Sequence, residues 1–210
     1  MITIILVVLT GIISYQAFNN PEFKAKLLFH PVTIQNQGEW YRFISSGFIH
    51  SDWGHLFINM FVLYQFGQIA EGRFDYIFGD LGHLAYIIFY LSSIAKASLP
   101  SSLRYRNNYG YTALGASGAT SALVFAYILF APWEWFVFPP VPAIVFGVLY
   151  LLYSSYMDKR GGDNIGHNAH FWGAVYGLLF IIVASWLMQP SLIGYFIDQL
   201  AAGPKAPNFF

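Results

Sequence analysis

The sequence contains no cysteine and very little charge, and both shortages restrict what the protein can be. With no thiol in 210 residues, the chain cannot form a disulfide, a thiolate metal site or a cysteine nucleophile. Charged residues make up 10 % of the chain, whereas an ordinary soluble domain is about a quarter charged. The charges also balance to a formal net charge of zero, so no basic surface for a nucleic-acid partner is expected.

Hydrophobic residues account for 57 % of the chain, and they gather in long runs that predict a membrane protein. A helix needs about 20 apolar residues to cross the bilayer, and lipid offers no partners to irregular backbone. We therefore expect an all-α polytopic membrane protein that forms a single domain over 1–210. The N-terminal run lacks the basic region of a cleavable signal peptide, which predicts a retained first span. The predicted spans are about 2–18, 53–70, 81–98, 114–131, 140–156 and 169–188, and a short C-terminal tail covers 191–210.

Two connections between the spans have a distinctive composition. The first, from Asn19 to Phe48, is long and mixes apolar with basic residues, so we expect it to lie in the membrane interface. The connection from Leu99 to Thr112 is polar and is expected to be a loop. A short interfacial helix is expected over 191–200, and the chain end from 203 to 210 is expected to fray.

Polar side chains lie near the start of the second, fourth and sixth predicted spans. They are His55 and Asn59 in the second span, Ser117 in the fourth and His170 in the sixth. Because successive spans cross in opposite directions, these three starts lie on the same side of the membrane. A polar side chain within a span is costly and normally faces the bundle interior. The sequence therefore predicts one site that the four residues share.

Small residues around Ser117 and His170 predict that their helices approach closely. Gly115 and Gly118 flank the serine, while Gly173 and Gly177 form a small-xxx-small face of the kind that permits tight helix contact. His170 lies on that same face. This packing is what brings a hydroxyl and an imidazole within about 3 Å.

The chemistry expected of these residues is nucleophilic catalysis. A serine hydroxyl becomes a nucleophile when a base removes its proton, and histidine can act as that base near neutral pH. We predict a dyad of Ser117 and His170, because the spacing brings no acidic residue into the site. Attack on a carbonyl creates an oxyanion, for which His55, Asn59 and the backbone at the start of the fourth span are candidate donors.

Each feature also has a structural alternative. Ser117 can be a packing residue, His170 can lie in the membrane interface, and His55 and Asn59 can join helices by hydrogen bonds. A metal site made of His55, His167 and His170 is another alternative. It lacks an acidic or cysteine ligand within the spans, and the amide of Asn59 is a poor ligand for such metals.

Five short motifs occur in a specific order over about residues 38–188. They are Trp40-Tyr41-Arg42, His50 with His55 and Asn59, Glu71-Gly72-Arg73, Gly115-Ala116-Ser117-Gly118, and Ala169-His170 followed by Gly173 and Gly177. Together they resemble the rhomboid family of intramembrane serine proteases. The resemblance implies a six-transmembrane-helix rhomboid-like bundle with a long membrane-embedded first loop and a water-accessible cavity.

The resemblance also implies a role for each site residue. Ser117 would be the nucleophile and His170 the general base, while His55 and Asn59 would complete an oxyanion hole with the Ser117 backbone. Six further motif residues would be structural supports. Trp40 and Arg42 would support the first loop, and those that would support the helix contact are Gly115, Gly118, Gly173 and Gly177.

The family's function implies the partners and the location. Substrates would be transmembrane proteins cleaved in or beside a membrane-spanning segment within the lipid bilayer, with no cofactor and no metal. The fifth span and the loop before His170 would act as gate and cap. A multi-pass protein of the cell (inner) membrane is expected. The alternative is a catalytically inactive rhomboid-like protein that binds transmembrane segments.

Three features differ from the family pattern or compete with the assignment. The fourth residue after the nucleophile, often an aromatic that stacks on the catalytic ring, is Ser121 here, so Tyr176 or Trp172 is expected to position His170. His167 is a rival base expected in the cap. The family's orientation places the N-terminus in the cytoplasm and the site outside. Most of the ten Lys and Arg residues, however, lie on the site side, which favours the reverse orientation. We keep the family's orientation, because the charges of an embedded first loop need not count as translocated.

Overall fold

The computed structural model describes residues 1–137, 139–163 and 165–204, and their regular structure is helical. The only β-pairing in these ranges consists of two isolated bridges, so the predicted all-α class is confirmed. The elements in chain order are α1 (Ile2–Asn19), α2 (Pro21–Leu27), α3 (Pro31–Gln37), α4 (Arg42–Ser45), the 3-10 turn η1 (Ser46–Phe48), α5 (Trp53–Phe78), the 3-10 turn η2 (Gly79–Leu81), α6 (Gly82–Arg104), α7 (Ser117–Phe130), α8 (Ala143–Arg160), α9 (His167–Met188) and α10 (Ser191–Ala202).

Three helical stretches in these ranges are long and apolar enough to cross a membrane. They are Ile2–Asn19, the continuous stretch Trp53–Arg104 and His167–Met188. The helix Ser117–Phe130 is apolar but shorter. Length and composition therefore support an integral membrane protein.

The outward faces of these helices support the same conclusion. The buried face of α1 carries the hydroxyls of Thr3, Thr10 and Ser14. Large apolar side chains of the same helix are exposed on its other face, namely Ile4, Ile5, Val8, Leu9 and Ile12. A helix that turns its polar residues inward and its apolar residues outward is suited to lipid rather than to water.

Several helix ends differ from the sequence-based expectation. The second predicted span continues beyond 70 to Phe78, through the Glu71-Gly72-Arg73 motif. Glu71 is 8 % exposed, and its carboxylate accepts hydrogen bonds from the backbone N–H groups of Ile2 (2.7 Å) and Thr3 (3.0 Å) at the start of α1. These contacts with a distant helix stabilise the extra turns of α5.

Three further boundaries are corrected. The helix α6 runs to Arg104 with Pro100 inside it, so the first part of the expected loop is helical. The helix α7 begins at Ser117 rather than at 114. The helix α9 begins at His167, which therefore lies in the same helix as His170 and not in a separate cap. The expected C-terminal helix is present as α10, and residues 205–210 of the expected frayed tail lie outside the described residues.

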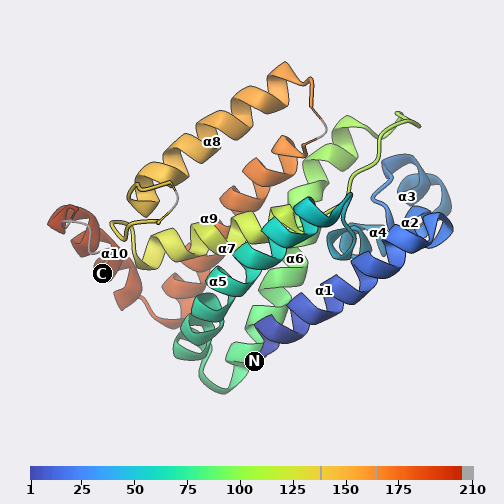
Figure 1. Ribbon diagram of the computed structural model, residues 1–210. Helices are drawn as coiled ribbons and strands as arrows, with labels where there is room; N and C mark the ends of the chain where they lie inside the picture. The colour runs from blue at the N-terminus through green and yellow to red at the C-terminus, as the bar shows by residue number, and fades with distance from the viewer. Residues whose placement is uncertain (138, 164, 205–210) are drawn as a thin grey trace.

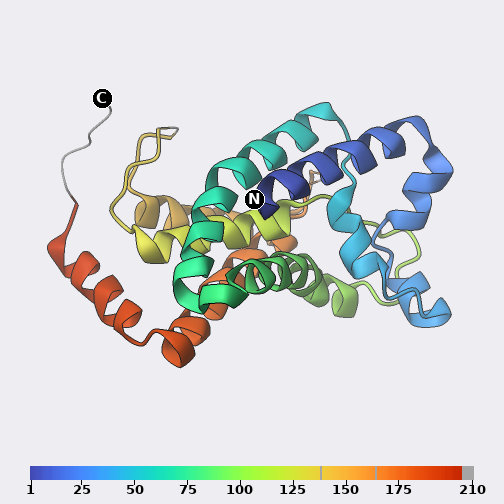
Figure 2. The same cartoon turned by 90° about the horizontal axis from the view of Figure 1, so that it is seen from below.

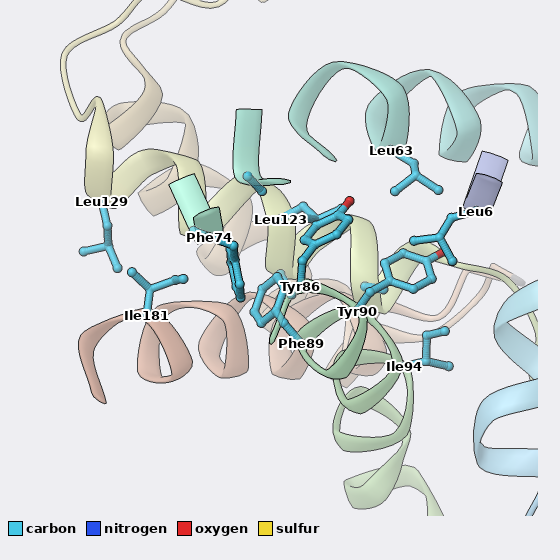
Figure 3. Packing of buried hydrophobic residues seen from close by; sticks show 14 of the residues in the cluster. Leu6, Leu63, Phe74, Tyr86, Phe89, Tyr90, Ile94, Leu123, Leu129 and Ile181 are labelled. Carbon is cyan, nitrogen blue, oxygen red and sulfur yellow. The ribbon is translucent and has the colours of Figure 1, made fainter. Parts of the chain in front are cut away.

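The helix α7 is the centre of the bundle, since nearly all of its side chains are buried. It lies against α5, α6 and α9. Figure 1 shows α1 and α8 on opposite flanks of these helices. The main core, drawn in Figure 3, joins α1, α5, α6, α7 and α9 through Leu6, Leu63, Phe74, Tyr86, Phe89, Tyr90, Ile94, Leu123, Leu129 and Ile181. Ser117 is thus the first residue of the most enclosed helix.

The first connection folds into three short helices and the turn η1 at one end of the bundle, away from α10 (Figure 2). Two of its helices, α2 and α3, begin where the sequence provides a cap and a proline. The Asn20 side chain accepts from the Phe23 N–H before Pro21, and the His30 ring accepts from the Thr33 N–H before Pro31. The first connection is therefore an ordered segment of short helices, which can support residues of the site.

Candidate active site

The backbone before Ser117 has a conformation that only glycine adopts readily. Gly115 has a φ of +112°, in the region that L side chains avoid. A Cβ at this position would also lie 2.6 Å from Cε1 of His55. The chain turns here and enters α7 at Ser117, where the first N–H groups of a helix have no partner within the helix. These N–H groups are suitable donors for an oxyanion.

The helices α7 and α9 meet at glycine. A Cβ on Gly173 would lie 2.1 Å from the Gly118 carbonyl oxygen, and a Cβ on Gly177 would lie 2.3 Å from the Ala122 carbonyl oxygen. A Cβ on Gly118 would lie 2.5 Å from the Ala97 Cβ of α6. The first turn of α7 and the first turns of α9 are therefore in backbone contact, and Ser117 and His170 belong to these turns.

Two rings lie beside the His170 ring: that of Tyr150 on α8 and, edge-on with centroids 5.8 Å apart, that of His167 on α9. The ring of Tyr150 is stacked with the His170 ring, with centroids 6.1 Å apart and an interplanar angle of 21°. The hydroxyl of Tyr176 instead bonds to Ser92 Oγ at 2.7 Å, and Trp172 packs edge-on against its neighbour Phe171 and is 41 % exposed. The structure thus places Tyr150, and not Tyr176 or Trp172 as expected, against the His170 ring.

A small cavity opens beside Ser117. Its volume is about 40 Å³, which is room for a few water molecules or one small side chain. Polar residues of three segments line it, among them Ser46, Ser98 and Ser117, together with Ala169 next to His170. Between the described residues Ser117 and His170 no side-chain hydrogen bond is formed. Such contacts often tighten only when substrate binds.

The predicted oxyanion-hole residues lie on α5, facing the start of α7. The ring of His55 lies against Gly115, and its Nδ1 is 3.0 Å from Ser51 Oγ. Asn59 is buried, donates from its amide to the His55 carbonyl at 2.9 Å and accepts from Thr120 Oγ1 at 3.2 Å. In this arrangement Asn59 joins α5 to the first turn of α7. The His55 ring lies closer to the nucleophile loop, that is, to Gly115 and Ala116 just before Ser117.

His50, which belongs to the second of the five motifs, makes contacts that the sequence did not reveal. It is fully buried; its Nε2 accepts from the Ala116 N–H at 3.2 Å, and its Nδ1 lies 2.9 Å from Ser14 Oγ. Because Nε2 accepts, the proton of the neutral ring is on Nδ1 and is donated to Ser14. Burial, reinforced by the nearby His55, lowers the pKa of His50 to about 3. His50 therefore fixes the loop before Ser117 to α1 as a neutral ring.

Arg42 holds the first connection in shape. It is 8 % exposed, and its guanidinium donates to the carbonyls of Ala25 and Leu28, each at 2.8 Å, and to Glu39. Trp40 lies on the outside of the same segment, 64 % exposed, and stacks on Phe43. Of the two residues expected to support this loop, Arg42 makes the internal contacts.

The histidines do not gather into a metal centre. Among the described residues there is no group of three His, Asp or Glu side chains that could hold an ion. His167 pairs with Asp163 at 3.1 Å, and this hydrogen bond lowers the pKa of Asp163. The alternative site of His55, His167 and His170 is therefore not assembled in the described parts of the chain.

The sequence also matches a known protein family over most of its length. A family model described as the rhomboid domain matches residues 37–187. The chain belongs to the rhomboid family. The match extends from the end of α3 to the end of α9 and so contains every rhomboid motif that the sequence displays.

Two rhomboid relatives come from Arabidopsis thaliana. RHOMBOID-like protein 12, mitochondrial, is 30 % identical over 150 residues, which are 65 % of this chain and 44 % of that protein. Rhomboid-like protein 11, chloroplastic, is 28 % identical over 184 residues, which are 79 % of this chain and 57 % of that protein. The matches thus cover about half the length of each relative. Their names refer to organelles, so the expected cell (inner) membrane is not supported, whereas an integral membrane protein is.

Proposed function

We propose that this rhomboid-family chain is a serine endopeptidase that hydrolyses peptide bonds in or beside transmembrane segments. Ser117 is the nucleophile and His170 is the general base. The observation that carries the proposal is the backbone contact of α7 with α9 at Gly118 and Gly173. It brings the turn of the serine and the turn of the histidine together beside a polar cavity.

The reaction follows from these positions. The His170 ring takes the proton of the Ser117 hydroxyl as the oxygen attacks the carbonyl carbon of the scissile bond. The resulting oxyanion is stabilised by the N–H groups at the start of α7 and by the side chains of His55 and Asn59. His170 then gives the proton to the leaving amine. In the second half of the reaction His170 takes a proton from a water molecule as the water attacks the acyl-enzyme, and it returns that proton to the Ser117 oxygen as the acid product leaves.

The substrates proposed are membrane proteins that reach the site within the bilayer. In this proposal α1, α5, α6, α7, α8 and α9 are the six spans, and the first connection is embedded in the membrane interface. The cavity of about 40 Å³ beside Ser117 supports a preference for a small side chain next to the cleaved bond. Cleavage also requires an extended peptide, so a segment with weak helix propensity is the preferred target.

The test is cleavage of a single-span reporter by the wild type, Ser117→Ala and His170→Ala in the same membranes. We expect either substitution to reduce the rate by at least about 10³-fold, because each removes one member of a unit that acts together. The matched control is Ser154→Ala. Ser154 is another buried serine, and its hydroxyl has no hydrogen-bond partner among the described residues. Its loss should leave the rate within about twofold.

A binder that does not cut is the second candidate, since the Ser117 hydroxyl and the His170 ring are not hydrogen-bonded here. Labelling with a serine-directed phosphonate separates the two functions. A protease is labelled in the wild type and not in Ser117→Ala. Reporter binding without labelling or cleavage would instead establish the binder, and cleavage that survives in either dyad variant would remove the proposed assignment.

A further inference from the structure

Tyr150 of α8 contacts the ring of His170 and is connected to Ser117 through Ser121. Its ring is stacked with the His170 ring at 6.1 Å between centroids. Its hydroxyl lies 2.6 Å from Ser121 Oγ, and Ser121 Oγ donates to the Ser117 carbonyl oxygen at 2.7 Å. One residue of α8 is thus connected to the base through its ring and to the backbone of the nucleophile through its hydroxyl.

The direction of these hydrogen bonds is fixed by the chemistry of the hydroxyls. Ser121 has one O–H donor, and the Ser117 carbonyl can only accept, so the Ser121 proton points to Ser117. The Tyr150 hydroxyl must then donate to Ser121 Oγ. The result is an ordered chain of two bonds in which each donor orients the next acceptor.

We infer that Tyr150 is a positioning residue that aligns the His170 ring with Ser117, and that its alignment depends on α8 being docked against α7 and α9. The inference rests on the proposed protease function and deepens it. The side chain adds no proton or electron pair to the reaction. It restricts where the imidazole lies while the base and the hydroxyl are not yet hydrogen-bonded.

The placement of α8 makes this alignment dependent on docking. The helix lies at the edge of the bundle (Figure 1). Its C-terminal end is fastened by Asp158, which pairs with Arg104 at 2.9 Å and accepts from Asn168 at 3.3 Å. Nearer its other end, Gly147 lies against Ile128 of α7. Tyr150 lies between these two attachments, so a displacement of α8 from α7 and α9 removes the ring from His170 and the hydroxyl from Ser121 together.

The experiment measures kcat and KM for reporter cleavage by Tyr150→Phe, Tyr150→Ala and Ser121→Ala. Tyr150→Phe keeps the ring and loses the hydroxyl, so kcat should fall about 3–10-fold. Tyr150→Ala loses both contacts, and kcat should fall about 10–100-fold with KM within about twofold. Because Tyr150 and Ser121 act through one hydrogen bond, the double variant Tyr150→Phe/Ser121→Ala should be no slower than the slower single variant.

The matched control is Phe146→Leu. Phe146 lies one turn earlier on α8 and stacks on Tyr150, so its truncation loosens the same packing without touching Ser121 or His170. The unfolding temperature in the same detergent should fall similarly for Phe146→Leu and Tyr150→Phe, while kcat should fall only for Tyr150→Phe. Equal kcat values in these two variants would overturn the inference, as would a faster Tyr150→Phe with a lower KM, which would mark the residue as a latch that blocks entry.

The outcomes separate the inference from the function on which it rests. Cleavage that depends on Ser117 but is unaffected by every Tyr150 variant would refute the positioning role and leave the protease intact. Cleavage that does not depend on Ser117 would refute both.

Discussion

Replacement of Gly173 by alanine tests the contact on which the proposed site depends. The added Cβ would lie 2.1 Å from the oxygen, 2.8 Å from the carbon and 2.9 Å from the Cα of Gly118, against about 3.4 Å for an ordinary contact. All three neighbours are backbone atoms, so the helices must separate by about 1 Å. Overpacking of this kind costs about 1–3 kcal/mol, and the better helix propensity of alanine offsets up to about 1 kcal/mol of that.

The effect on catalysis should exceed the effect on stability. His170 lies one turn before Gly173 on the same face of α9, and a misplacement of about 1 Å in a catalytic group can cost about 10²-fold in rate. We expect reporter cleavage to fall about 10²-fold while the protein still folds. The assay measures cleavage and thermal unfolding of Gly173→Ala in one detergent.

Two further glycines provide the comparison for this prediction. Gly72 lies in α5 with nothing within 4 Å of its added Cβ, so Gly72→Ala should keep full activity and gain up to about 1 kcal/mol in stability. Gly177→Ala meets the Ala122 carbonyl oxygen at 2.3 Å, one turn further from His170, and should lose stability with a smaller loss of rate. If Gly173→Ala cleaves as fast as Gly72→Ala, the close approach of α7 and α9 is not what assembles the site.

Two other predictions concern the nucleophile loop and the arrangement of the helices. Burial lowers the pKa of His50 from 6.5 to about 3, so its neutral ring stabilises the fold fully above pH 6.5. Up to about 5 kcal/mol of this stabilisation is lost as the pH falls toward 3. The unfolding temperature of His50→Gln should therefore fall less steeply between pH 7.5 and 4.5 than that of the wild type, and parallel curves would refute the role. The chain has no cysteine, so a single Asp80→Cys and a single Asn108→Cys, both at exposed positions, should react with an impermeant maleimide from opposite sides of the membrane. Labelling of both from one side would contradict the proposal that α6 spans it.

The helices of the bundle could be predicted because long apolar runs are a local property of the sequence. Their ends could not, because contacts with distant segments decide them. The continuation of α5 through Glu71 depends on N–H groups that α1 supplies. The late start of α7 depends on the turn at Gly115, where the His55 ring leaves no room for a side chain.

The candidate site shows the same division. Glycine spacing pointed to Gly173 and Gly177, and these are the positions at which α9 lies against α7. The contacts of Tyr150 and His50 could not be predicted, since each joins segments that are far apart in the sequence. Tyr150 is one of several bulky residues on α8, and nothing in its spacing distinguishes it from Phe146 or Tyr153.

The isolated bridge between Phe29 and Ala113 affects how the family's segments can be exchanged. Two backbone hydrogen bonds, each of 3.0 Å, join the first connection to the strand of chain that leads into Ser117, and Phe29 also lines the cavity beside the serine. A chimaera that takes residues 20–48 from a relative therefore replaces one side of the cavity but not the segment that pairs with it. Exchanging residues 105–116 together with the connection keeps the two paired segments matched. That double exchange is the one expected to transfer a relative's substrate preference.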